Sequence, residues 1–319
     1  MRARQRPRDP RVTTGSNHGE ARNETGAHVQ LAFASLTDPG GRQRNEDSLG
    51  DWSSERLFYC VVADGAGGHG GGDTASAIVV DTVLADLRYL TLAELPPTGE
   101  RLANALAHAN DNIVEEQSHG GPALRDMRST ATLLAIDCER RTAAWAHCGD
   151  TRLYCFRAGQ IVAQTRDHSM VQDMVDARLI SAEAARHHPR RNVLFSALGT
   201  LEGLSIAALP GTFGLCGNDA FLICTDGFWE YVEEATMLAT LAQAASPRAW
   251  IEALAAHVRA HAKAGNDNFS ASAVWVGEDV GGEMALATQE TQRADTREVR
   301  IADDEATVMH PGPARKGDA

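Results

Sequence analysis

Acidic residues lie at the ends of apolar, strand-like runs in several parts of this 319-residue chain. Asp64 and Gly65 follow the apolar run 57–63, where a hard cation could approach both the carboxylate and the glycine carbonyl. Mg²⁺ and Mn²⁺ prefer such oxygen ligands. Further acids stand at strand edges or tight turns, namely Glu46-Asp47, Asp150, Asp226 and Asp267. One such acid is usually a turn or cap residue, but the whole set indicates a divalent-metal centre.

The glycine-rich run 64–70 allows a second interpretation. It reads D-G-A-G-G-H-G and fits the G-x-G-x-x-G pattern of dinucleotide-binding loops. Asp64 would place a carboxylate against the pyrophosphate, which is repulsive. The strands that follow are joined by short links, whereas a Rossmann unit needs parallel βαβ crossovers. A dinucleotide-binding oxidoreductase is therefore the weaker alternative.

The elements that must position these acids are short strands and a few helices. Strands are expected at 29–35, 57–63, 130–137, 143–148, 152–157, 160–165, 204–209, 220–225 and 271–276. The four strands from 130 to 165 have very short links, which predicts antiparallel neighbours. Ala158-Gly159 predicts a two-residue hairpin turn. Helices are expected at 73–90, 101–117, 181–187 and 247–261. The mixture predicts an α+β layered fold.

Composition narrows the class of protein. The chain has 43 acidic and 30 basic residues, a net charge of −13, which argues against nucleic acid as a partner. No apolar run is long enough to span a membrane. Residues 1–28 and 278–319 are expected to be a disordered N-terminal extension and a disordered acidic C-terminal tail, leaving 29–277 as one domain. The six cysteines form no C-x-x-C pair and no apolar leader follows the N-terminal arginines. Buried, reduced thiols and a cytoplasmic location are therefore expected.

Over about residues 31–277 the sequence resembles the metal-dependent protein phosphatases of the type 2C (PPM) family, in their bacterial Ser/Thr form. The motifs occur in the family's order at 42–47 (R-x-x-N-E-D), 64–69 (D-G-x-G-G-H), 127–130, 149–152 (G-D-x-R, expected in a hairpin), 167–169 (D-H-S), 188–199, 226–227 and 267–268. The resemblance implies a four-layer sandwich of two antiparallel β-sheets flanked by helices. It also implies Mg²⁺- or Mn²⁺-dependent hydrolysis of phosphoserine and phosphothreonine on proteins, opposing a Ser/Thr kinase.

The same resemblance implies a role for each acid. Asp64 would bridge two metal ions, and the Gly65 carbonyl would bind one of them. Asp226 and Asp267 would hold the first metal, while Glu46 would reach the second through water. Such a pair of ions deprotonates a bridging water near neutral pH and neutralises phosphoryl oxygens. The hydroxide would attack phosphorus in line and expel the Ser or Thr alkoxide without a phosphoenzyme.

Three further residues are candidates at the site. Arg42 is expected to bind phosphate, because a guanidinium matches two phosphate oxygens. Asp150 resembles the acid that helps to hold a third metal in bacterial members, and stabilisation of a turn is its equal alternative. His69 is a candidate proton relay to the leaving group, or a cap of the following helix.

The chain departs from the family pattern at four positions. Ala66 stands where bacterial members usually have Met, Arg128 replaces a Gly, and Thr151 replaces a Ser. Arg178 stands where the flap segment 165–195 often has Gly, and it is a candidate for altering substrate choice. None of these changes removes an expected metal ligand.

Two expectations concern partners. Thr307 follows three acids in the tail. It is a candidate phosphorylation site for a phosphothreonine-reading partner, and a solvated acidic tail is the simpler interpretation. The chain is expected to be monomeric. A catalytically silent phosphoprotein-binding module of the same fold is the other functional alternative, which the presence of Asp64, Asp226 and Asp267 disfavours.

Overall fold

The computed structural model describes residues 29–67, 71–277 and 297–299. Within these ranges the strands form two sheets in which every pairing is antiparallel. The first sheet contains, in spatial order, β1 (Leu31–Asp38), β11 (Phe269–Val276), β10 (Ala220–Cys224), β6 (Arg152–Arg157) and β7 (Gln160–Gln164). The second contains β12 (Arg297–Val299), β8 (Ile206–Ala208), β5 (Thr142–Cys148), β4 (Arg128–Asp137), β3 (Leu57–Ala66) and β2 (Asp47–Ser53), with β9 (Phe213–Gly214) paired to β5. No parallel crossover of the Rossmann type joins these described strands.

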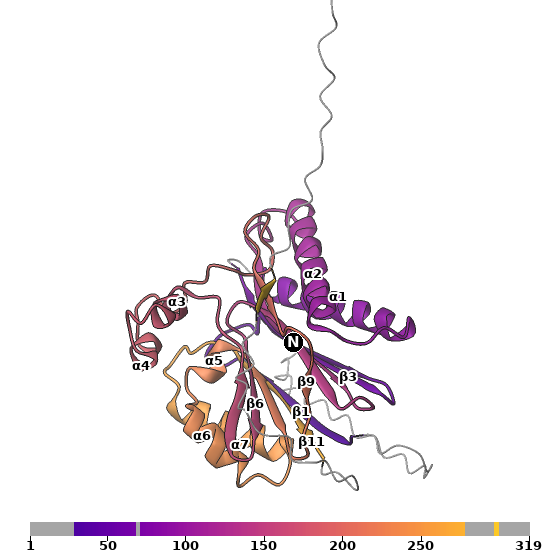
Figure 1. The fold of residues 1–319 in the computed structure, drawn as a ribbon. Helices are drawn as coiled ribbons and strands as arrows, with labels where there is room; N and C mark the ends of the chain where they lie inside the picture. The colour runs from indigo at the N-terminus through magenta and orange to yellow at the C-terminus, as the bar shows by residue number, and fades with distance from the viewer. Residues whose placement is uncertain (1–28, 68–70, 278–296, 300–319) are drawn as a thin grey trace, which may run out of the picture.

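Helices cover the outer face of each sheet (Figure 1). The second sheet is covered by α1 (Gly72–Leu92) and α2 (Gly99–His119). The first sheet is covered by α5 (Asp226–Trp229), α6 (Glu234–Leu241) and α7 (Pro247–His261). Two short helices, α3 (Met170–Asp176) and α4 (Ala182–Arg186), stand to one side of the sandwich.

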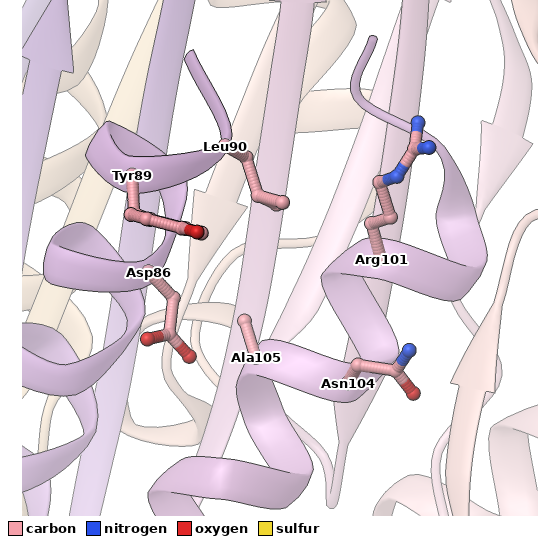
Figure 2. Close-up of a pocket in the computed structure, with 6 residues that line it drawn as sticks. All are labelled: Asp86, Tyr89, Leu90, Arg101, Asn104 and Ala105. Carbon is pink, nitrogen blue, oxygen red and sulfur yellow. The ribbon is translucent and has the colours of Figure 1, made fainter. Parts of the chain in front are cut away.

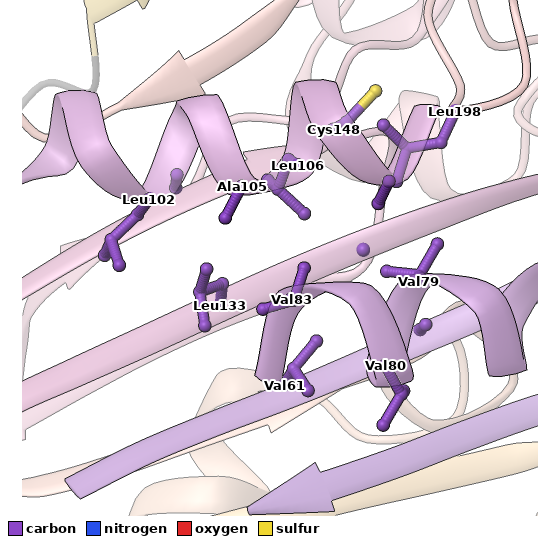
Figure 3. Close-up of a cluster of buried hydrophobic side chains, with 14 of the residues drawn as sticks. Val61, Val79, Val80, Val83, Leu102, Ala105, Leu106, Leu133, Cys148 and Leu198 are labelled. Atoms are coloured by element: carbon purple, nitrogen blue, oxygen red, sulfur yellow. The ribbon is translucent and has the colours of Figure 1, made fainter. Parts of the chain in front are cut away.

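Three apolar clusters fill the three spaces between the four layers. Alternate residues of β3 point to opposite faces, so Val61 packs against α1 and α2, whereas Val62 faces the other sheet. Figure 3 shows the first of these clusters between the two helices and the second sheet. Leu222 and Trp250 belong to the third cluster, between the first sheet and α7. The predicted four-layer sandwich is confirmed.

Helix boundaries follow from local capping. The Ser246 hydroxyl accepts a hydrogen bond from the Ala249 amide, and Pro247 occupies the first turn of α7, as the sequence predicts. The Thr98 hydroxyl caps α2 in the same way. Both longer predicted helices, at 73–90 and 101–117, are present with slightly wider bounds.

The link between β5 and β6 differs from the sequence expectation. The two strands do not form a hairpin: β5 pairs within the second sheet and β6 within the first. Gly149 has a φ of +92°, and a Cβ there would lie 2.4 Å from Thr130 Cβ, so the crossing from sheet to sheet requires glycine. The hairpin between β6 and β7 is confirmed, with positive φ at both Ala158 and Gly159.

Other expectations meet different outcomes. Within the expected disordered tail, residues 297–299 form β12, which supplies a partner for the edge of β8. All six cysteines are free, and five are buried, but Cys216 is exposed, contrary to expectation. His69, Thr307 and the segment 1–28 lie outside the described residues. Within the described ranges, no helix combines the length and the apolarity needed to cross a lipid bilayer.

Candidate metal centre and active site

Asp64 and Asp226 meet at the end of the space between the two sheets. Asp64 lies on the same face of β3 as Val62, which faces the opposite sheet. Asp226 follows β10 of that sheet and is the first residue of α5. The Asp64 side chain influences the pKa of Asp226, and Asp226 Oδ1 is buried and has no hydrogen-bond partner. The fold therefore brings together the two acids expected to form the centre of a metal site.

Electrostatics place the other acids around this pair. Burial raises the pKa of Asp64 well above its usual range, and the charges of Asp47, Asp226, Asp150 and Asp267 raise it further. The pKa of buried Asp150 is likewise raised, first by burial and then by the charge of Asp226. Each of these carboxylates disfavours ionisation of its neighbours. A bound cation would remove this penalty.

Glu46 and Gly65 converge beside the first residue of α1. A Cβ on Gly72 would lie 2.7 Å from the Gly65 carbonyl oxygen and 2.9 Å from Glu46 Oε2. Because Gly72 has no side chain, these two oxygens line a small cradle that a Cβ would fill. The Glu46 amide donates to Asn268 Oδ1 at 2.8 Å, which fixes the backbone from which this carboxylate extends.

Arg42 and Asp267 form an ion pair. Arg42 Nη2 lies 2.9 Å from Asp267 Oδ2, and the side chains are 55% and 47% exposed. Asp267 Oδ1 accepts from the amide of Asn268. The expected phosphate-binding residue therefore lies beside an expected metal ligand, at the solvent-facing edge of the acid cluster.

Asp47 is a member of the cluster to which sequence reasoning gave no role. Its Oδ2 accepts hydrogen bonds from Ser270 Oγ at 2.6 Å and Thr225 Oγ1 at 3.1 Å, and its partner across the β2–β3 ladder is Asp64. Burial raises the pKa of Asp47 to about 7, opposed by the Ser270 hydrogen bond and reinforced by the charge of Asp226. Asp47 is the last acid of the R-x-x-N-E-D motif, and this position could have indicated from the sequence that it belongs to the site.

Asp150 lies on the segment that crosses between the sheets, so a role in a hairpin turn is wrong. Trp229 Nε1 donates to the Asp150 carbonyl at 2.9 Å. The Trp229 ring lies 3.5 Å from the Arg152 guanidinium carbon, and Arg152 forms two hydrogen bonds to Asp167, at 2.8 and 2.7 Å. This buried network fixes the backbone of Asp150 beside Asp226.

By chemical type the donors suit a divalent cation. In the described part of the chain, no three His, Cys, Asp or Glu side chains are close enough together to hold a metal ion as they stand. The donors are carboxylate and carbonyl oxygens, which suit Mg²⁺ and Mn²⁺. The unpartnered Asp226 Oδ1 and the cradle beside Gly72 are two positions where a cation would satisfy oxygens.

The two histidines near this region support the backbone. Their rings stack with centroids 4.8 Å apart, His147 Nε2 donates to the Arg166 carbonyl, and His168 Nδ1 accepts from the Gly149 amide. Burial lowers the pKa of His147 and lowers that of His168 to about 3. Both are therefore neutral hydrogen-bonding residues at physiological pH.

Three of the residues that depart from the family pattern, Ala66, Arg128 and Thr151, lie on β3, on β4 and at the crossing between the sheets. Arg128 pairs across the ladder with Ala66, and its guanidinium donates to the preceding backbone carbonyl. Thr151 Oγ1 hydrogen-bonds Thr130 Oγ1 at 2.6 Å. Thr151, which replaces the serine of the family motif, therefore forms a buried hydrogen bond within the fold.

A hollow of about 170 Å³ lies elsewhere, between α1 and α2 (Figure 2). It is lined by Asp86, Tyr89, Leu90, Arg101, Asn104 and Ala105. None of these is an expected site residue, so this hollow does not mark the centre, which is defined by converging carboxylates.

Comparison with known proteins agrees with this geometry. A family model described as protein phosphatase 2C matches residues 41–264. The serine/threonine protein phosphatase PstP of Mycobacterium tuberculosis is 32% identical over 214 residues, which are 66% of this chain and 39% of PstP. The chain thus spans well under half of that relative. The serine/threonine phosphatase stp of Listeria innocua is 32% identical over 204 residues, 63% of this chain and 79% of stp.

Solved structures show the same likeness. The crystal structure of the M. tuberculosis serine/threonine phosphatase PstP/Ppp superposes with a TM-score of 0.64 at 29% identity, covering 78% of this chain and all of that one. The catalytic domain of PstP in complex with two manganese ions gives a TM-score of 0.63 at 28% identity, covering 79% and all of that chain. The motifs, the four-layer fold and the family match over more than half of the sequence lead to one conclusion: this chain belongs to the protein phosphatase 2C family.

Proposed function

We propose that this chain is a metal-dependent protein Ser/Thr phosphatase that hydrolyses phosphoserine and phosphothreonine on proteins. The observation that carries the proposal is the meeting of Asp64 and Asp226, from two facing sheets, with Asp226 Oδ1 buried and unpartnered. An unpartnered buried carboxylate oxygen is costly unless a cation or donor satisfies it. A structural module would have no need to gather such acids at one point.

The donors divide between two proposed cation sites. Asp64, Asp226 and Asp267 would supply carboxylates for the first, while Asp64, Glu46 and the Gly65 carbonyl would supply oxygens for the second. Asp150 is the candidate ligand for a third. Mn²⁺ or Mg²⁺ matches this all-oxygen set, and the manganese complex of PstP supports metal dependence.

When bound, such a cation pair lowers the pKa of a shared water and neutralises charge on the phosphoryl group. The remaining roles belong to the protein. Asp64 is the acid on which the others converge electrostatically, because burial and the charges of four other carboxylates raise its pKa. Arg42, exposed at the edge, binds phosphate oxygens and orients the phosphorus toward the acid cluster. The buried network around Arg152 holds the backbone of Asp150 and the α5 helix that begins with Asp226.

The substrate class rests on the relatives, which are named serine/threonine phosphatases. A cognate Ser/Thr kinase would supply the substrate, since a phosphatase of this class reverses kinase action. A monomeric state, a cytoplasmic location and recognition of Thr307 by a phosphothreonine reader remain predictions from the sequence.

Phosphate release from phosphoserine, phosphothreonine and phosphotyrosine peptides tests the proposal. The full chain should release phosphate from the first two when Mn²⁺ or Mg²⁺ is present and show none in EDTA. A matched reaction with EDTA followed by excess Mn²⁺ should restore turnover. Phosphopeptide binding without metal-dependent turnover would instead establish the silent binding module and contradict the proposal.

A further inference from the structure

The segment 165–195, here called the flap, connects β7 to the strands that follow and contains α3 and α4 (Figure 1). Its two arms are joined at the base, because the Phe195 amide donates to the His168 carbonyl at 3.0 Å. The first arm is fixed to the catalytic body where the His168 amide donates to the Gly149 carbonyl, next to Asp150. The base of the flap therefore stands beside the candidate metal centre.

Arg191, on the returning arm, reaches across to the helix that carries a candidate metal ligand. Its Nε lies 2.8 Å from Glu230 Oε1, and its Nη2 lies 3.3 Å from Glu230 Oε2. This two-pronged geometry is stronger and more directional than a single contact. The side chains are 38% and 19% exposed, so the Glu230 end of the pair is largely shielded from water.

Glu230 is the C-cap residue directly after the short helix α5, which Asp226 begins. The Glu230 amide donates to the Asp226 carbonyl at 2.9 Å, so the two residues are one helical turn apart. A displacement of Glu230 therefore moves the backbone at Asp226.

The ion pairs of Arg166, by contrast, do not connect the flap to the rest of the domain. Arg166 pairs with Asp173 and Asp176, and these contacts stay inside the flap. Arg190, adjacent to Arg191, is exposed and has no ion pair among the described residues. Of these three arginines, Arg191 is the one that pairs with a residue outside the flap, namely Glu230 at the C-terminal end of α5.

We propose that Arg191 is a positioning residue, whose ion pair with Glu230 fastens the flap to α5 and couples the placement of the flap to cation binding at Asp226. This inference rests on the proposed function, because it assigns the flap a place as the wall of the phosphopeptide site. Coupling is reciprocal, so cation binding that orders α5 also orders the flap, and a fastened flap favours the bound centre.

Hydrogen exchange of flap amides in the full chain tests the inference without relying on turnover. In wild type, Mn²⁺ should slow exchange of the amides of α3 and the returning arm, relative to EDTA. Arg191→Gln and Glu230→Gln should each speed exchange there by about threefold to tenfold and remove the Mn²⁺ effect. Arg190→Gln is the matched control and should behave as wild type. Equal flap exchange in wild type and Arg191→Gln would overturn the inference.

Kinetics provide the second measurement. In Arg191→Gln, measured at saturating Mn²⁺ to offset weaker cation binding, KM for a phosphothreonine peptide should rise severalfold, whereas KM for p-nitrophenyl phosphate, which has no peptide to lie along the flap, should rise less. The charge-swapped double variant Arg191→Glu with Glu230→Arg should recover flap protection and KM in part. If wild type has no metal-dependent turnover, the proposed function fails. If turnover is present but KM and flap exchange are unchanged in Arg191→Gln, this inference alone fails.

Discussion

Arg42 Nη2 lies 2.9 Å from Asp267 Oδ2, so the candidate phosphate-binding residue is the ion-pair partner of a candidate metal ligand. Both side chains are about half exposed, where such a pair contributes about 0–1 kcal/mol. A divalent cation attracts Asp267 far more strongly. Metal binding should therefore free Arg42 for the phosphate group.

Arg42→Gln separates these two roles. We expect kcat/KM for a phosphothreonine peptide to fall by about 10- to 100-fold, because a charge-assisted phosphate contact is lost. Mn²⁺ affinity, measured by calorimetry, should stay equal or rise up to about fivefold, because Asp267 loses a competing partner. Arg44→Gln, at an exposed neighbouring arginine, should change neither value. Weaker Mn²⁺ binding in Arg42→Gln would contradict this account.

Gly72→Ala tests the cradle between Glu46 and Gly65. The added Cβ would lie 2.9 Å from Glu46 Oε2 and 2.7 Å from the Gly65 carbonyl, so one of these oxygens must move. We expect the weaker of two Mn²⁺ binding events to lose about tenfold or more in affinity. Gly214→Ala, where a Cβ meets nothing within 4 Å, is the matched control. Unchanged Mn²⁺ stoichiometry and affinity in Gly72→Ala would exclude a cation at this position.

The stabilisation given by Mn²⁺ should grow with pH. The pKa of Asp47 is about 7 and that of Asp226 about 6, both raised chiefly by burial above the usual 3.8. A raised carboxyl pKa means that the folded protein binds more protons than the unfolded chain. The contribution of these groups to stability is therefore present at low pH and is lost as the pH rises through about 6 to 7.

A cation must displace those protons at low pH but not at high pH. Thermal melts with Mn²⁺ and with EDTA should therefore differ little near pH 5 and most near pH 8. Comparing plus and minus metal at each pH cancels the effect of neutral, buried His147 and His168, whose lowered pKa values favour unfolding in acid. In Asp226→Asn the difference between the two melts should nearly vanish. A metal-induced rise in Tm that is larger near pH 5 than near pH 8 would contradict the proposed ligands.

Arg178 should be a strained position in the flap. Its φ is +58°, and its amide donates to the Val175 carbonyl while the Leu179 amide donates to the Met174 carbonyl, the hydrogen bonds of a helix end that favours glycine. Arg178→Gly should slow exchange of the Leu179 amide by an amount that corresponds to at most about 1 kcal/mol. Arg178→Ala removes the charge but keeps the Cβ, so it should not slow exchange. If both variants slowed exchange of the Leu179 amide equally relative to wild type, the effect would come from removal of the charge and not from relief of backbone strain.

Much of the sheet framework could be predicted because its strands are apolar runs bounded by turn residues. The crossing at Gly149 could not be predicted, since a short link can return within one sheet or pass to another. Only packing between the two sheets decides this. The strand β2, Asp47–Ser53, lacks an apolar run because it lies at the edge of its sheet and is mostly half-buried. Its pairing with β3 depends on tertiary contacts and cannot be read from the local sequence.

The site was predictable at the level of residue type. The acids at strand ends, together with the family motifs, indicated Asp64 and Asp226, which the fold brings together. The Arg42–Asp267 pair was not predictable, because its members are 225 residues apart and meet only through the fold. The contact between Arg191 and Glu230 likewise joins two segments that are distant in the sequence and meet only through the fold.

The central claim is that the carboxylates around Asp64 hold cations that make the chain a phosphatase. The most direct measurement is Mn²⁺-dependent phosphate release from a phosphothreonine peptide by wild type and by Asp226→Asn, with Mn²⁺ binding to both proteins measured by calorimetry. We expect Asp226→Asn to remain folded, to lose at least one Mn²⁺ binding event and to lose turnover by about a hundredfold or more. Wild-type turnover in Asp226→Asn, or undiminished turnover of wild type in EDTA, would contradict the account.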